Sequence, residues 1–336
     1  MFRGLVAARG KIINMRDKRV AVIRGGPSDE YEVSMQTGAS VLEALRTLDY
    51  FAKDIVVSRG GEWLENGIIR EPNQALQAID VVFLALHGNF GEDGAIQRIL
   101  EQEHIPFTGS RAFASNMALN KDIAKNYLKQ FGVKMPKHLK VTRSATRDPY
   151  RTAESITQLF GPKYVIKPVN SGSSLGASMV DREVDLALAL TNALTEFEEV
   201  LVEEQISGKE ATVGLTENYR GQSLYLLPVI EIVPPKEARF FDYQSKYSGV
   251  TEEICPGRFS DTERGELQRL AKLVHQELGL QQYSRSDFIV KDGDAYFLEV
   301  NTLPGLTKES LFPKAFQAIG SSYNDMIKHL VETARV

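Results

Sequence analysis

The first third of the chain alternates apolar runs with helically spaced apolar residues, and this alternation restricts the fold more than any other feature of the sequence. The run RVAVI at 19–23 predicts a buried strand, and apolar residues at helical spacing follow over 41–48. Two further strands and one helix are expected at 55–57, 81–86 and 95–103. Strands that alternate with helices favour a parallel sheet covered by helices, so we predict an α/β domain over residues 16–112.

The rest of the chain predicts two α+β units, which we place at 113–206 and 207–336. In the first unit we expect helices and strands at 116–131, 164–166, after 181 and at 200–202. In the second we expect antiparallel strands at 211–215 and 224–230, a helix over 267–278 closed by Gly279, and strands at 288–290 and 295–300. We expect residues 1–15 to form a disordered leader. The predicted fold class is therefore α/β and α+β.

The composition is that of a soluble globular protein, with 43% hydrophobic and 25% charged residues. The net charge of −4 provides no basic surface for phosphates of nucleic acid, so we expect no nucleic-acid partner. Cys255 is the only cysteine, which excludes an intrachain disulfide and favours a reducing compartment such as the cytoplasm. No apolar run approaches the length of a membrane span, so we expect no membrane partner.

A loop of small residues follows the strand expected at 164–166. The segment KPVNSGSSLG at 167–176 places Lys167 at the strand end and then supplies glycines and serines whose N–H groups could bind an anion. A flexible turn is the competing interpretation, and these residues alone do not decide between the two. Neither the Walker pattern nor the glycine pattern of dinucleotide-binding proteins occurs in this loop, so a phosphate site would have a different architecture.

A second loop, HGNFGEDG at 87–94, follows the strand expected at 81–86. Ligands of open α/β sheets collect beyond the carboxyl ends of the strands. The loop is therefore either part of a binding site or a mobile connector in which glycines turn the chain. His87 is also compatible with a structural histidine inside the fold.

Three oxygen-bearing side chains converge on the hairpin that the strands at 288–290 and 295–300 predict. Glu299 and Asn301 share a face of one strand, and Asp287 can face them from the other. Mg²⁺ takes few protein carboxylates and completes its shell with water and phosphates, so the cluster suits a complex of metal and nucleotide. The alternative is a solvated acidic hairpin.

Taken together, these segments resemble the ATP-grasp superfamily, and within it the D-alanine–D-alanine ligase family. The resemblance covers about residue 20 to the C-terminus and rests on motifs that are specific only jointly. They are GGPSDEYEVS at 25–34, ALHGNFGEDG at 85–94, IPFTGS at 105–110, KPVNSGSSLG at 167–176, VLVEEQISGKE at 200–210, DYQSKYSG at 242–249, RSD at 285–287 and EVNTLPGLTKESLFP at 299–313. The implied fold is an N-terminal parallel-sheet α/β domain followed by a two-part ATP-grasp fold. The implied activity is the ATP-dependent ligation of two D-alanines through an acylphosphate, for peptidoglycan precursor synthesis.

The resemblance implies a site for ATP with two Mg²⁺ ions, for which Mn²⁺ could substitute. The metal ions would be bound by Asp287, Glu299 and Asn301. The phosphates would lie against Lys121 and Lys167. The remaining positions that would bind the nucleotide are Ser174, Glu203, Glu204, Ile206, Glu210, Phe240, Lys246 and Leu298.

The resemblance also implies two subsites for D-alanine. Glu30 would orient the amino group of the first D-alanine, in a hydrogen-bonded set with Ser173 and Tyr247. Arg285 and the Gly305 N–H would stabilise the oxyanion of the reaction. The substrate-binding positions would be Val33, His87, Ser310 and Leu311, with the last two at the carboxylate of the second D-alanine.

The sequence departs from the usual family pattern at Tyr31, Asn120 and Glu204. Asn120 stands where an aspartate commonly precedes the lysine, so no negative charge directly precedes Lys121 in the sequence, which puts the exact placement of Lys121 in question. Two other functions stay open, namely another ATP-grasp carboxylate–amine ligase, such as an L-amino-acid or peptide ligase, and a catalytically silent nucleotide-binding protein. Small molecules are the expected partners, a homodimer is one possible assembly, and Tyr247 predicts dipeptide rather than depsipeptide products.

Overall fold

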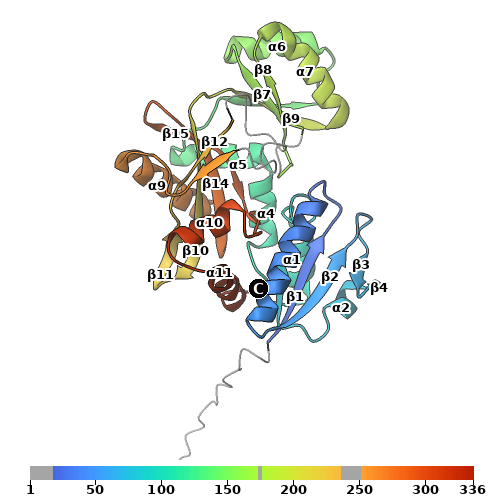
Figure 1. Cartoon of the computed structure of the whole chain (residues 1–336). Helices are drawn as coiled ribbons and strands as arrows, with labels where there is room; N and C mark the ends of the chain where they lie inside the picture. The colour runs from blue at the N-terminus through green and yellow to red at the C-terminus, as the bar shows by residue number, and fades with distance from the viewer. Residues whose placement is uncertain (1–17, 173–175, 236–250) are drawn as a thin grey trace, which may run out of the picture.

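Three β-sheets and their covering helices form the fold over residues 18–172, 176–235 and 251–336, which the computed structural model describes (Figure 1). The leader expected at 1–15 lies outside the described residues. The mixed α/β and α+β character expected from the sequence is confirmed. The domain boundaries at 112 and 206 stay predictions. Among the described helices, none is long and apolar enough to cross a membrane.

The N-terminal sheet has the strand order β4-β3-β2-β1-β5. Its parallel strands are β1 (Arg19–Gly25), β2 (Phe51–Val57) and β5 (Val81–Leu84), which confirms the predicted parallel pairing. The helices of this part are α1 (Tyr31–Thr47), α2 (Pro72–Ala75) and α3 (Ala95–Gln102). The helically spaced residues of α1, Val41, Leu42 and Leu45, are buried in the core that this sheet shares with its helices.

An antiparallel hairpin that the sequence analysis missed extends this sheet. It consists of β3 (Trp63–Glu65) and β4 (Ile68–Arg70), and β3 pairs antiparallel with β2. The turn between them is Asn66-Gly67, with φ of 51° and 78°. An Asn-Gly pair adopts two positive φ angles readily, and it is therefore the ordinary sequence signal for such a two-residue turn.

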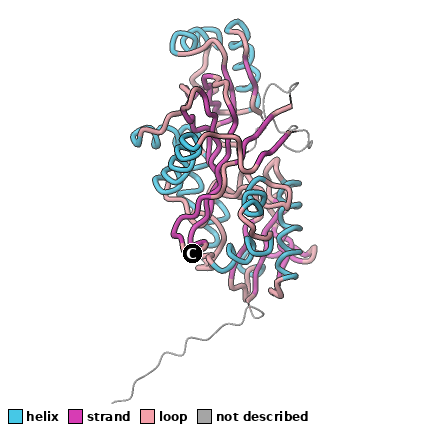
Figure 2. The backbone as a smooth tube through the Cα atoms, turned by 60° about the vertical axis from the view of Figure 1, so that its left-hand side comes forward, coloured by secondary structure: helices cyan, strands magenta, loops and turns pink. Residues whose placement is uncertain are grey.

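The central sheet is antiparallel throughout, in the order β6-β9-β7-β8. Its strands are β6 (His138–Thr142), β7 (Tyr164–Pro168), β8 (Ser178–Val180) and β9 (Glu199–Glu204). Two helices, α6 (Pro149–Leu159) and α7 (Glu183–Glu196), pack on it around a separate core. Figures 1 and 2 show this unit at one end of the molecule, away from the N-terminal sheet.

The C-terminal sheet has the order β13-β12-β10-β14-β15, with β11 paired to β10. Its strands are β10 (Lys209–Tyr219), β11 (Gln222–Leu226), β12 (Ile230–Val233), β13 (Glu252–Ile254), β14 (Tyr283–Lys291) and β15 (Asp294–Asn301). The strand expected at 224–230 is thus two strands, and both pair antiparallel with β10. The helices are α9 (Asp261–Glu277), α10 (Leu311–Ala318) and α11 (Tyr323–Glu332). The expected helix over 267–278 is confirmed as α9, with Gly279 at φ 64° after its end.

The single helix expected at 116–131 is wrong, because the chain forms α4 (Ala112–Leu119), α5 (Lys121–Leu128) and a 3-10 turn η2 (Lys129–Phe131). The break lies at Asn120, whose backbone is extended and whose side chain accepts a hydrogen bond from the Ile123 N–H. Asparagine competes with helical hydrogen bonding in this way and favours the N-cap position. As a result Lys121 stands at the first position of a new helix, with its N–H bonded to Val169 O at 3.1 Å.

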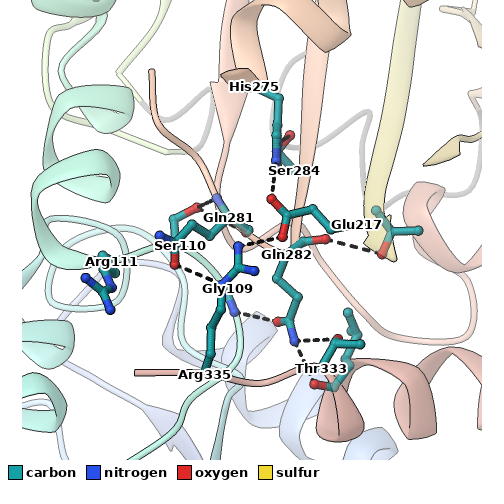
Figure 3. Close-up of polar contacts among 12 residues, drawn as sticks. Gly109, Ser110, Arg111, Glu217, His275, Gln281, Gln282, Ser284, Thr333 and Arg335 are labelled. Atoms are coloured by element: carbon teal, nitrogen blue, oxygen red, sulfur yellow. Dashed lines mark hydrogen bonds and ion pairs between the residues drawn. The ribbon is translucent and has the colours of Figure 1, made fainter. Parts of the chain in front are cut away.

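Polar contacts join the N-terminal part to the C-terminal sheet (Figure 3). The Gln282 amide accepts from the Gly109 N–H at 2.7 Å and donates to Leu330 O at 2.7 Å and to Thr333 Oγ1 at 3.0 Å. The Ser110 hydroxyl accepts from the Gln281 N–H at 3.0 Å. Because Gln282 is 2% exposed, these buried contacts hold residues 109–110 at the start of β14.

Candidate active site

Two neighbouring cavities lie where the three sheets approach each other. The larger, of about 900 Å³, is lined by α1, by the loop after β5 and by the loop at 303–310. The smaller, of about 340 Å³, is lined by β7, β9, β10, β14 and β15. Arg285 and Leu311 line both cavities, so the two spaces meet at these side chains.

The smaller cavity gathers the nucleotide-binding positions that the sequence implies and that fall within the described residues. They are Lys121, Lys167, Glu203, Glu204, Ile206, Glu210 and Leu298, together with Asp287 and Glu299. Lys121 is 6% exposed, and its ammonium group lies 3.3 Å from Glu299 Oε2 and donates to Ser171 O. Lys121 therefore has a negative partner in the fold, although Asn120 supplies none in the sequence.

A buried ion-pair cluster borders this cavity. Lys167 Nζ lies 2.8 Å from Glu203 Oε2, and Lys125 Nζ contacts the other oxygen of the same carboxylate. Burial alone would raise the pKa of Glu203, but the two ammonium groups lower it to about 2. Burial lowers the pKa of Lys125 to about 8, against the raising effect of Glu203. Sequence analysis missed Lys125, although its position four residues after Lys121 puts both lysines on one face of α5.

The carboxylates expected to bind metal are opposite each other in the hairpin. Asp287 pairs in register with Glu299, while Phe288 pairs with Phe297, so a bulge leaves Leu298 as the extra residue. The bulge lets the sequence neighbours Leu298 and Glu299 both line the smaller cavity. The side chains of Asp287 and Glu299 are 19% and 20% exposed, so the alternative of a solvated acidic hairpin is wrong.

These side chains fit a magnesium ion by their donor chemistry. Two carboxylates and the Asn301 amide are hard oxygen donors, and they leave positions on the ion for phosphate and water. Asp287 accepts from Arg285 at 3.0 and 2.9 Å and from the Asn301 amide at 3.1 Å, which orients its carboxylate. Within the described part of the chain no group of three or more His, Cys, Asp or Glu side chains is placed to hold a metal ion.

The larger cavity gathers the amino-acid-binding positions that the sequence implies. They are Glu30, Val33, His87, Arg285, Gly305, Ser310 and Leu311. Asn301, which was expected to bind metal, also lines this larger cavity, whereas Asp287 and Glu299 line the smaller one. Ser310 precedes α10 but does not cap it, because its hydroxyl bonds to the N–H and hydroxyl of Thr307 at 3.2 and 2.8 Å. The first N–H groups of α10 therefore have no side-chain cap at the cavity, and a helix N-terminus of this kind favours a carboxylate.

His87 forms part of the wall of the larger cavity and has both ring nitrogens engaged. Nδ1 lies 2.9 Å from Leu303 O and Nε2 lies 3.0 Å from Thr37 Oγ1. Because a carbonyl oxygen only accepts, Nδ1 carries the proton and Nε2 accepts from the threonine hydroxyl. These contacts join α1 to the loop after β15, as expected for a structural histidine. Its role beside a substrate stays a prediction.

Glu92 is a buried carboxylate that sequence analysis did not single out. Its Oε2 accepts from the Gly88 N–H at 3.1 Å, and its Oε1 accepts from the N–H groups of Thr302 and Leu303 at 3.0 and 2.8 Å. Burial raises the pKa of this carboxyl, against the lowering effect of these hydrogen bonds. Glu92 thus joins the loop after β5 to the loop after β15, two segments that both line the larger cavity.

Five positions implied by the resemblance lie outside the described residues. They are Ser173, Ser174, Phe240, Lys246 and Tyr247. The predicted preference for a dipeptide product depends on Tyr247 and stays a prediction.

The environment of His87 predicts a pH dependence of stability. Burial lowers the pKa of His87 to about 4, whereas an unfolded histidine titrates near pH ~6.5. The unfolded state therefore binds a proton that the folded state excludes, so the stabilising contribution is complete above pH ~6.5 and is lost as the pH falls through about 4, by roughly 3 kcal/mol. We expect nitrogen NMR of the ring to show the neutral Nδ1–H form unchanged from about pH 8 to about pH 5. Uptake of a proton between pH 6 and 7 would contradict this assignment.

Known proteins match the chain along almost its whole length. Residues 66–110 match the family model "D-ala D-ala ligase N-terminus", and residues 127–332 match "D-ala D-ala ligase C-terminus". D-alanine–D-alanine ligase of Syntrophotalea carbinolica is 38% identical over 324 residues, which cover 95% of this chain and 97% of that protein. The ligase of the same name from Halalkalibacterium halodurans is 37% identical over 320 residues, covering 93% and 98%.

Solved structures give the same relationship. The VanG D-Ala:D-Ser ligase of Enterococcus faecalis superposes with a TM-score of 0.78 at 29% identity, covering 94% of this chain and 99% of that chain. The D-alanine–D-alanine ligase of Bacillus anthracis complexed with ATP superposes with a TM-score of 0.75 at 29% identity, covering 94% and 97%. The chain has the ATP-grasp fold and belongs to the D-alanine–D-alanine ligase family.

Proposed function

We propose that the chain ligates two D-alanines to D-alanyl-D-alanine with ATP and Mg²⁺, as a cytoplasmic step in making peptidoglycan precursors. The observation that carries the proposal is the meeting of the two cavities at Arg285. A ligase of this kind must bring the γ-phosphate of a nucleotide to the carboxylate of an amino acid. Arg285 stands at the junction where those two groups would meet. The homodimer remains an expectation.

The nucleotide cavity supports ATP binding by its charges. Phosphoryl transfer depends mainly on positioning and charge neutralisation, which Lys121 and Lys167 would supply at the phosphates. Asp287, Glu299 and Asn301 would hold Mg²⁺, and the bound ions would neutralise the charge of the phosphates. The adenine would lie against the segment at 203–206, which lines the same cavity.

Two chemical steps would follow. In the first, a carboxylate oxygen of the first D-alanine takes the γ-phosphoryl group, which gives an acylphosphate and ADP. In the second, the amine of the other D-alanine attacks the acyl carbon and loses a proton, the bond from carbon to the phosphate oxygen breaks, and phosphate leaves. Glu30 lines the amino-acid cavity and would bind the amino group of the first D-alanine, while the N-terminus of α10 would bind the carboxylate of the second.

Arg285 suits the role of oxyanion donor. Burial alone would lower the pKa of Arg285, but the neighbouring Asp287 carboxylate raises it. The guanidinium therefore stays charged although it is largely buried. A fixed donor at a developing oxyanion is worth ~3 kcal/mol in comparable enzymes. The Gly305 N–H would be a second donor, in a loop so close-packed that a Cβ at Gly305 would lie 3.0 Å from Ser310 Oγ.

The product identifies the function. With D-alanine, ATP and Mg²⁺ we expect mass spectrometry to find D-alanyl-D-alanine, with one ADP released for each dipeptide. L-alanine and D-serine in equal amounts serve as competitors. If L-alanine gives the faster product, the chain is another carboxylate–amine ligase, and if no amino acid elicits ADP release, it is a catalytically silent nucleotide-binding protein.

Substitution of Glu299 by glutamine tests the metal assignment. E299Q removes a negative charge where Mg²⁺ and phosphates would meet, so we expect turnover at saturating Mg²⁺ to fall about 100-fold or more. E266Q is the matched control, because Glu266 pairs with Arg269 on the surface at 2.7 Å. Its turnover should equal that of the unchanged protein. Full turnover of E299Q, with an unchanged thermal midpoint, would contradict the assignment.

A further inference from the structure

Lys125 is a fully buried cation that lines neither of the two cavities. Its side chain is 0% exposed, and it lies on α5, whose Ala124 and Leu128 pack into the core of the C-terminal sheet. From there its ammonium group reaches Glu203 on β9 of the central sheet. A buried cation is costly unless it is paired, so a lysine in this place needs a reason beyond packing.

The charges around Glu203 supply that reason. One carboxylate, on Glu203, is shared between two cations, Lys125 on Oε1 and Lys167 on Oε2. Glu299 is also near Lys125, but its carboxylate contacts Lys121. The cluster of Lys125, Lys167 and Glu203 therefore has one surplus positive charge. Lys167 lines the nucleotide cavity, so this surplus can be presented to an anion there.

The two lysines differ in what they can reach. Lys167 is 13% exposed and stands at the end of β7, beside the loop that begins at 169. Lys125 has no exposed surface and stays on Glu203. When Lys167 binds phosphate it must give up at least part of its contact with Glu203, and a buried carboxylate left without a partner is strongly unfavourable. Lys125 is placed to prevent that loss.

We propose that Lys125 is a positioning residue, which keeps Glu203 neutralised and thereby frees Lys167 to bind the phosphates of the nucleotide. The proposal rests on the proposed function only in that the smaller cavity binds a nucleotide. Without Lys125 the cluster has no surplus positive charge. Each contact that Lys167 makes with phosphate then removes the remaining counter-ion of the Glu203 carboxylate. Lys125 acts through Lys167 and touches neither substrate nor reacting atoms.

The substitution K125M tests this by direct binding, measured with ADP and with adenosine by calorimetry or competition. We expect K125M to weaken ADP binding at least about tenfold, because part of a buried charge pair is then lost on binding. Adenosine has no phosphate for Lys167 to bind, so its affinity should change less than about threefold. K134M is the matched control, since Lys134 pairs with Asp294 at 2.5 Å on the surface, and its ADP affinity should be unchanged.

A double-mutant cycle with E203Q keeps the test decisive if K125M lowers the thermal midpoint. The neutral glutamine needs no counter-ion, so adding K125M to E203Q should change ADP affinity less than about threefold. An equal loss of ADP and adenosine affinity in K125M, or the same loss in both backgrounds, would overturn the proposal. Failure of the proposed function has a different signature, because the unchanged protein would then make no D-alanyl-D-alanine while the binding cycle is still measured.

Discussion

The paired contact between the Arg285 guanidinium and the Asp287 carboxylate is the interaction on which the arrangement of the site depends. Both side chains lie on β14, and two parallel hydrogen bonds fix their relative orientation. The pair is largely buried, so loss of either member would leave the other as an uncompensated charge. Arg285 faces both cavities and Asp287 faces the nucleotide cavity, and the strand that carries them thus sets the place where the proposed substrates would meet.

The larger cavity exists only if the N-terminal part is held against β14, because both contribute to its lining. Two buried contacts from far along the chain contribute to this, besides the apolar core that the N-terminal sheet shares with α10 and α11. Glu92 binds the N–H groups at 302 and 303, and Gln282 binds Gly109. The second contact belongs to the network of Figure 3. There the Glu217 carboxylate accepts a hydrogen bond from the Arg335 guanidinium at 2.5 Å, and its other oxygen lies 3.4 Å from His275 Nε2. Because Glu92 and Gln282 are buried, their hydrogen bonds specify one orientation of the parts more than they add stability. Glu92 and Leu303 line the larger cavity, so this orientation fixes part of its wall.

Local sequence patterns predicted most helices and strands, but they did not predict the distant side-chain partners of buried charged residues. The period of two in the last hairpin placed Asp287 opposite Glu299, and helical spacing identified α1 and α9. Apolar spacing ran through Asn120, so the prediction gave one helix where side-chain capping makes two. Lys125 and Glu92 were missed for another reason. Their partners are 78 and 210 residues away, and a single sequence does not show which distant charge a buried residue meets.

The central claim is that ATP activates the carboxylate of the first D-alanine by phosphoryl transfer at the junction of the cavities. D-alanine labelled with ¹⁸O in its carboxylate tests this most directly, with the released phosphate analysed by mass spectrometry. If an acylphosphate forms and is attacked at carbon, each dipeptide made leaves one labelled oxygen in one phosphate. Dipeptide formed with unlabelled phosphate would contradict the account, because the carboxylate would then have been activated without receiving the phosphoryl group.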